Sequence, residues 1–172
     1  MTLNRNLQYF CSKLKHYYHQ QILLILRGGA ARLIASLYAR FDVCGVLKPG
    51  SNTGSLIETA KYDVEKLTMN DFLIICSGTN DIDRNYPTKA FKNITNFIKN
   101  VNHTNIILVS VPYRYDAKEY TYVNSTIKSF NNKLLKFTKL FSHVSTVAVV
   151  NNRLLSMDCI VMNQVKNYYQ IN

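Results

Sequence analysis

Short continuous apolar segments alternate with helical patterns along most of this 172-residue chain. Because these segments are unbroken rather than alternating, each is typical of a strand that is buried on both of its faces. The five predicted strands span residues 22–26, 42–47, 72–76, 105–111 and 144–150. Between them, apolar residues recur in steps of three and four, which is the spacing of one helix face. The predicted helices span residues 33–41, 56–67, 87–101, 123–141 and 160–171.

This strand–helix order limits the fold to a small set of architectures. Strands that alternate with helices form parallel sheets, because each crossover helix returns the chain to the same end of the sheet. The sequence therefore predicts one α/β domain over residues 21–172, a flavodoxin-like three-layer α/β/α sandwich with a five-stranded parallel sheet. Pro87 suits the first turn of a helix, and Ser51, Asn52 or Ser55 is available as the cap of the helix before it.

The first 20 residues follow neither pattern and are expected to form a basic, aromatic arm or a capping helix. The whole chain carries 21 lysine and arginine residues against 10 acidic ones, a formal charge of +11. Such an excess favours anionic partners, including nucleic acid and membrane surfaces. Basic residues interleaved with aromatic ones can also stack on bases. The candidate nucleic-acid contacts are Lys13, Lys15, Lys128, Lys133, Lys136 and Lys139.

The four cysteines are scattered and lack the spacing of a zinc site, so neither a metal nor another cofactor is expected. Cys44 and Cys76 lie inside apolar segments and are predicted to be buried thiols, which fits a reducing compartment. No apolar run approaches the ~20 residues that a membrane-spanning helix needs. The N-terminus lacks the apolar core of a signal peptide, although its basic character leaves a transit peptide open. We therefore expect a cytoplasmic monomer.

Ligands of open parallel sheets bind beyond the carboxyl ends of the strands, so the loops at that edge carry the candidate chemistry. After the third predicted strand, Gly78 allows a sharp turn, Asn80 offers an amide donor, and Asp81 can accept backbone N–H groups. The loop after the second predicted strand brings Gly50 to the same edge. A glycine N–H and an asparagine amide are the two donors that an oxyanion site requires. Ordinary turns remain the alternative, because glycine and asparagine are common turn residues.

These loops carry a resemblance to a known family. Residues 78–82 (GTNDI), after an apolar strand, resemble the G-x-N-D block of the SGNH (GDSL-type) hydrolases. Residues 46–50 resemble the block with the oxyanion glycine of that family, and residues 105–116 resemble its next strand and loop. Asn124 and Asn131 fit the following helix of a subgroup frequent in insect genomes and retrotransposon-related reading frames. The resemblance covers about residues 21–167 and implies that Gly50 and Asn80 are oxyanion donors.

The two blocks that should carry the nucleophile and the base depart from the family pattern. The G-D-S turn after the first strand reads Leu26-Arg27-Gly28, so Gly28 stands where the serine should be. In the C-terminal D-x-x-H block, Val161 stands in place of the histidine, and Asp158 has no histidine to orient. Glycine supplies no nucleophilic oxygen and valine accepts no proton, so the acyl-enzyme route is lost.

Three functions follow as alternatives. The first is a degenerate SGNH-type hydrolase kept as a binding module or a relic. In that case Arg27, Gly28 and Gly29 at a helix N-terminus are candidates to bind an anion such as phosphate or carboxylate, unless Arg27 merely faces solvent. The second is an RNA-binding protein of mobile-element type, because the superfamily includes non-catalytic members that bind RNA.

The third alternative is an active ester hydrolase with an unrecognised nucleophile. Three serines lie near the expected site, at positions 51, 55 and 77, but none follows the first predicted strand. His103 and His143 precede predicted strands and are therefore expected at the opposite edge of the sheet. The sequence thus offers this alternative a hydroxyl but no base beside it.

Overall fold

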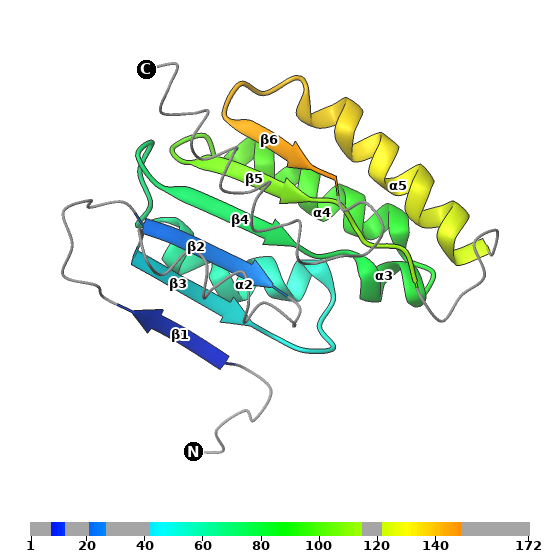
Figure 1. Ribbon diagram of the computed structural model, residues 1–172, viewed down its shortest axis with the longest axis horizontal. Coiled ribbons are helices and arrows are strands. Elements are labelled where there is room, and N and C mark those ends of the chain that lie inside the picture. The colour runs from blue at the N-terminus through cyan, green and yellow to red at the C-terminus, as the bar shows by residue number, and fades with distance from the viewer. Residues whose placement is uncertain (1–7, 13–20, 27–41, 115–121, 149–172) are drawn as a thin grey trace.

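The computed structural model describes residues 8–12, 21–26, 42–114 and 122–148 (Figure 1). These residues form one six-stranded sheet whose strand order is β1-β3-β2-β4-β5-β6. The strands are β1 (Gln8–Ser12), β2 (Gln21–Leu26), β3 (Asp42–Leu47), β4 (Phe72–Cys76), β5 (Asn105–Val109) and β6 (Val144–Val147). The helices are α2 (Thr53–Val64), α3 (Thr79–Asp83), α4 (Pro87–Asn100) and α5 (Tyr122–Thr138).

The five strands β2 to β6 are all parallel, which confirms the predicted α/β fold. From β2, in the middle of the sheet, the chain steps outward to β3 and then returns past β2 to β4. In a sheet of this order the ligand crevice lies where the order reverses, at the carboxyl ends of β2 and β4. The loops that follow these two strands and β3 therefore meet at one edge.

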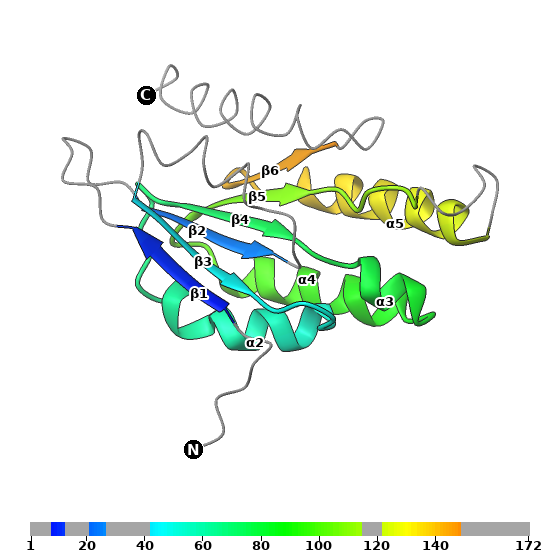
Figure 2. The ribbon, with the colours of Figure 1, turned by 60° about the horizontal axis from the view of Figure 1, so that its bottom comes forward.

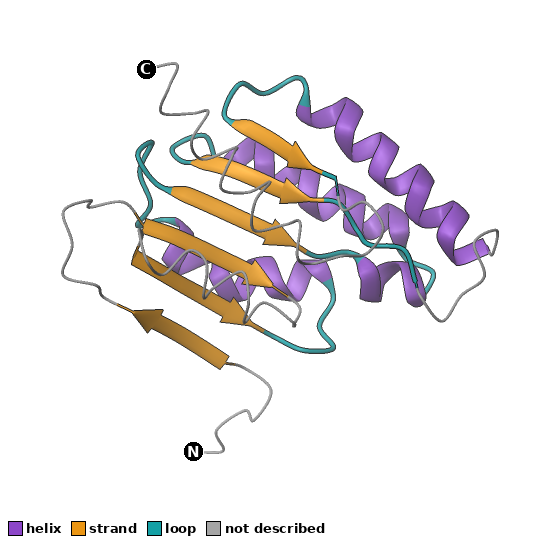
Figure 3. Cartoon of the chain, viewed as in Figure 1, coloured by secondary structure: helices purple, strands orange, loops and turns teal. Residues whose placement is uncertain are grey.

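Helices α2, α4 and α5 pack against the sheet, and α4 lies between the other two (Figures 2 and 3). Their inward residues join one face of the strands in a continuous apolar core that includes Leu56, Ile94, Ile127 and Phe130. The strand residues that face away from this core are equally buried, as Ile22 and Ile74 show. The central strands are thus buried on both faces, as their unbroken apolar sequences predict. The predicted helices 33–41 and 160–171 lie outside the described residues.

The helix boundaries follow local chemistry. Asn52 caps α2 by accepting a hydrogen bond from the Ser55 N–H at 2.9 Å, which selects one of the three predicted caps. Pro87 occupies the first turn of α4, as predicted. None of the helices in the described part of the chain is long and apolar enough to cross a bilayer.

Part of the predicted N-terminal arm instead belongs to the sheet. Gln8–Ser12 form β1, which pairs antiparallel with β3 and so covers main-chain groups that β3 would otherwise expose at the sheet edge. In this register Cys11 lies opposite Cys44. Cys44 is disulfide-bonded, so the prediction of a buried thiol there was wrong. Cys76 is half-buried and is not part of a disulfide.

Candidate functional site

The turn after β3 presents Gly50 at the carboxyl edge of the sheet. The Ser51 N–H donates to the Lys48 carbonyl at 3.3 Å, which closes a four-residue turn with Pro49 and Gly50 at its centre. Gly50 has φ 73°, so this is the type II turn that proline followed by glycine favours. A side chain added at Gly50 would meet no atom within 4 Å. The positive φ, not crowding, therefore requires glycine here.

The turn after β4 leads into a short helix rather than the predicted loop. Gly78 has φ 112° at the N-cap of α3, and a Cβ there would lie 2.9 Å from a Val111 methyl group. Both the backbone angle and the close approach of Val111 require glycine. The helix holds Asn80 and Asp81, which are both buried. A five-residue helix carries too few positions to show a helical period in the sequence.

Two side chains of α3 tie these turns together. The Asn80 Nδ2 atom donates to the Ser51 carbonyl at 2.7 Å, which places this amide beside the turn of Gly50, as the topology predicts. The Asp81 Oδ2 atom accepts the Thr53 N–H at 2.9 Å and the Thr53 hydroxyl at 2.7 Å. Asp81 thus joins the start of α2 to α3. From the sequence, Asp81 was expected to hold its own turn instead.

Gly50, Ser51, Thr53, Asn80, Asp81 and Arg84 form one hydrogen-bonded cluster, and two of these residues were not predicted from the sequence. The Arg84 guanidinium donates to the Gly50 carbonyl at 3.2 Å, and Thr53 supplies the paired donors for Asp81. Neither residue belongs to the motif that drew attention to these loops. A threonine at the beginning of a predicted helix was the available signal for Thr53, because such residues commonly satisfy helix-terminal groups.

The cluster can donate hydrogen bonds to an anion. A side-chain amide carries two N–H bonds, and Asn80 donates one of them to the Ser51 carbonyl. Within the described ranges, the second Asn80 N–H and the Gly50 main-chain N–H have no acceptor. Two such donors on adjacent turns are the kind of group that stabilises a negatively charged oxygen.

The described part of the chain provides a hydroxyl near this cluster but no base beside it. The Ser77 Oγ atom, directly after β4, is buried and has no hydrogen-bond partner among the described residues. His103 and His143 precede β5 and β6 and so lie at the opposite edge of the sheet, as predicted. The His103 Nε2 donates to the Val64 carbonyl at 3.1 Å, and the His143 Nε2 donates to the Val101 carbonyl at 2.9 Å. Both imidazoles therefore anchor chain connections far from Ser77.

The loop after β5 is fixed by two asparagines of α5. Asn131 accepts the Val111 N–H and donates to the Val111 carbonyl, each at 2.9 Å. Asn124 accepts the Arg114 N–H at 3.0 Å, and the Arg114 guanidinium pairs with Asp83. These contacts hold the third loop against α3 and α5. They give a structural reason for asparagine at both positions.

Several predicted site residues lie outside the described residues. They include both altered catalytic positions and the candidate anion-binding turn, namely Lys13, Lys15, Arg27, Gly28, Gly29, Asp158 and Val161. The predicted basic residues of α5 and the turn after it are described, and Lys128, Lys133, Lys136 and Lys139 are all exposed. Within the described ranges, no group of three or more potential metal ligands comes together.

Comparison with known proteins gives a likeness in structure but not in sequence. No model of a known protein family matches this chain, and no curated protein matches it. A protein from Streptococcus pneumonia, whose structure is provisionally described as that of a platelet activating factor, superposes with a TM-score of 0.59 at 21% identity. The match covers 76% of this chain and 64% of that one. This likeness concerns the fold alone, an α/β fold built on a parallel sheet.

Proposed function

We propose that this chain is an SGNH-type hydrolase domain that has lost ester hydrolysis and kept its anion-binding edge as a binding module or a relic. One observation carries the proposal. The turns with Gly50 and Asn80 are joined at one edge of the sheet, while the nucleophile and base positions of the resembling blocks hold Gly28 and Val161. Donors for a charged oxygen are thus kept in a chain that lacks the groups that generate one.

The chemical argument is one of missing atoms. Acyl transfer needs an oxygen or sulfur nucleophile, a base that takes its proton, and a group that orients the base. Glycine at position 28 and valine at position 161 supply none of these, so Asp158 has no imidazole to orient. The two donors can stabilise an oxyanion only after a nucleophile has attacked the ester, so alone they are expected to leave hydrolysis at the background rate.

An anionic group is the ligand class that fits what remains. Position 28 follows β2 by two residues, and β2 neighbours β4 at the crevice of the sheet. Arg27 would therefore add a cation close to the donors of Asn80 and Gly50. Glycines at positions 28 and 29 would let a carboxylate or phosphate approach the main chain. Binding of such a group requires no proton transfer, which the altered positions could not provide.

Ester turnover tests this proposal directly. We expect purified protein to hydrolyse 4-nitrophenyl acetate at the background rate, and we expect Asn80→Ala to leave that rate unchanged. The rate of nitrophenolate release at neutral pH, with enzyme concentration varied, is the measurement. A rate proportional to enzyme that falls about 10²-fold or more in Asn80→Ala would instead assign catalysis to this edge. Ser77 would then be the hydroxyl to examine, as in the alternative of an unrecognised nucleophile.

A further inference from the structure

The helices α4 and α5 lie in a strongly basic part of the chain. Residues 84–148 contain ten lysine or arginine residues and two acidic ones, Asp116 and Glu119, which lie outside the described residues. The two helices pack against each other (Figure 1), and the lysines of both are exposed. This excess of positive charge favours a polyanion over a neutral or cationic partner.

A groove of about 400 Å³ runs between these two helices. Its lining combines the aromatic rings of Phe91 and Phe130 with polar groups of α5, among them Ser125, Ser129 and Lys133. Lys133, from α5, thus places a cation beside an apolar floor.

Two exposed tyrosines lie near the start of the groove. Tyr122, the first residue of α5, lines the groove, is 73% exposed, and donates from its hydroxyl to the Asn85 side-chain oxygen at 3.3 Å. Tyr86 is the next residue along the chain from Asn85, forms the N-cap of α4, and is 60% exposed. The hydrogen bond therefore places the ring of Tyr122 close to the turn that carries Tyr86.

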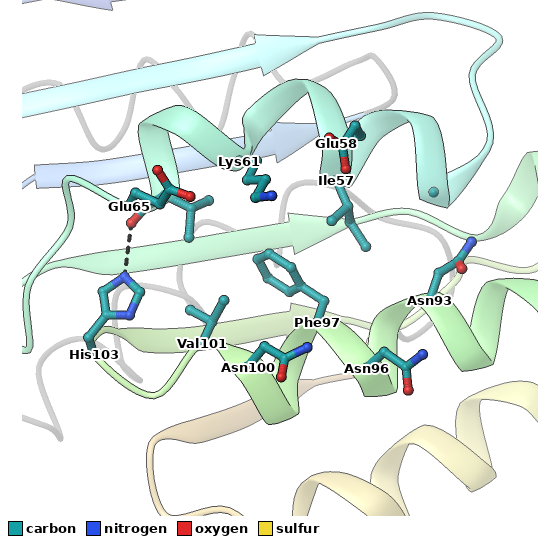
Figure 4. A pocket seen from close by; sticks show the side chains of 12 residues that line it. Ile57, Glu58, Lys61, Glu65, Asn93, Asn96, Phe97, Asn100, Val101 and His103 are labelled. Atoms are coloured by element: carbon teal, nitrogen blue, oxygen red, sulfur yellow. Dashed lines mark hydrogen bonds between the residues drawn. The ribbon is translucent and has the colours of Figure 1, made fainter.

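The neighbouring groove provides an internal comparison. It lies between α2 and α4, has a similar volume of about 370 Å³, and also contains an aromatic ring, that of Phe97 (Figure 4). Its α2 side, however, carries Glu58 and Glu65 together with Lys61 (Figure 4). Among the described residues, the lining of the α4–α5 groove thus carries a lysine without an acid, whereas the α2–α4 groove carries both charges.

We propose that the α4–α5 groove binds single-stranded nucleic acid, with lysines on the phosphates and the rings of Tyr86 and Tyr122 stacked on bases. A single strand offers both a line of negative charge and open base faces, which is what a cationic groove with aromatic rings recognises. A duplex keeps its bases stacked inside, and a flat anionic bilayer cannot enter a groove. This activity is separate from the proposed loss of hydrolysis, because it uses none of the residues around Asn80.

Fluorescence anisotropy with a labelled oligouridine of about 15 nucleotides tests the proposal on the full chain. We expect binding at low salt whose dissociation constant rises steeply between 50 and 200 mM salt, roughly tenfold or more for a few phosphate contacts. Replacing Lys133 and Lys136 together by glutamine should weaken binding about tenfold at low salt. The matched control, Lys61→Gln with Lys66→Gln, removes the same charge from α2 and the turn that follows it, and should change binding less than twofold.

The tyrosines separate a single strand from other polyanions. We expect Tyr122→Ala to weaken oligouridine binding by at least about fivefold, as the loss of one stacked base predicts, and to leave heparin binding unchanged. Circular dichroism of each variant, including its thermal midpoint, establishes that it is folded. The proposal is overturned by any of three results: no binding at low salt, equal losses in the α2 and α5 variants, or vesicles rich in phosphatidylserine bound more tightly than RNA.

Discussion

A variant that carries Gly28→Ser together with Val161→His is expected to hydrolyse 4-nitrophenyl acetate at least about a hundredfold faster than the unmodified chain. The two substitutions place a hydroxyl and an imidazole at the positions that the resembling SGNH motifs assign to the nucleophile and the base, and Asp158 carries the carboxylate that would orient the imidazole. Each single variant should remain at background, because nucleophile and base act as one unit and the loss of either removes nearly the whole effect.

The Asn80 amide supplies the control for this gain. Adding Asn80→Ala to the restored variant should remove about 10²–10³-fold of the recovered rate, because one donor to the developing oxyanion is lost. In the G-D-S turn that residues 26–28 resemble, an aspartate stands at the position of Arg27. A second restored variant therefore combines Gly28→Ser and Val161→His with Arg27→Asp. Continued background rates in both restored variants, with unchanged circular dichroism, would contradict the assignment of positions 28 and 161.

Asp81→Ala is expected to lower the free energy of unfolding by about 3 kcal/mol. Asp81 is 3% exposed, and its carboxylate accepts both the N–H and the hydroxyl of Thr53, which is itself 1% exposed. Alanine would leave two buried donors without an acceptor and would release the start of α2 from α3. Each hydrogen bond to a charged group contributes about 1.5–3 kcal/mol, so the two together account for the expected loss.

Urea unfolding followed by circular dichroism measures this loss. Asp81→Asn keeps an oxygen acceptor in nearly the same place and should cost about 1–2 kcal/mol, less than alanine. Thr53→Val removes only the hydroxyl and tests that bond separately. A loss below about 0.5 kcal/mol for Asp81→Ala, the level of an ordinary surface substitution, would show that these bonds do not hold the two turns together.

The sheet could be predicted because its strands are short apolar runs between strong turn signals. The expected bounds of β3 and β4 match those observed, and Pro87 marks the start of α4. The strand β1 was missed because Gln8–Ser12 mix polar and aromatic residues, and only pairing with β3 gives them an extended structure. No local sequence pattern indicates that β1 pairs with β3, so the disulfide of Cys44 could not be predicted either.

The candidate site could also be predicted only in part. Gly50 and Asn80 were expected near each other because parallel strands deliver their following loops to one edge, and the Asn80–Ser51 hydrogen bond places them there. The partner of Asp81 could not be predicted, because Thr53 comes from another loop and only the packed fold decides which donors it meets. The same holds for Arg84, whose contact with Gly50 spans two elements.

The central claim is that the edge around Asn80 keeps its donors but has no activated nucleophile. Treatment of the purified protein with a fluorophosphonate, followed by intact mass and peptide mapping, tests it most directly, because the reagent modifies only serines that a base has activated. The account predicts no adduct on the unmodified chain and an adduct on the introduced serine of the restored variant. A stoichiometric adduct on any serine of the unmodified chain, abolished by prior unfolding, would contradict the account.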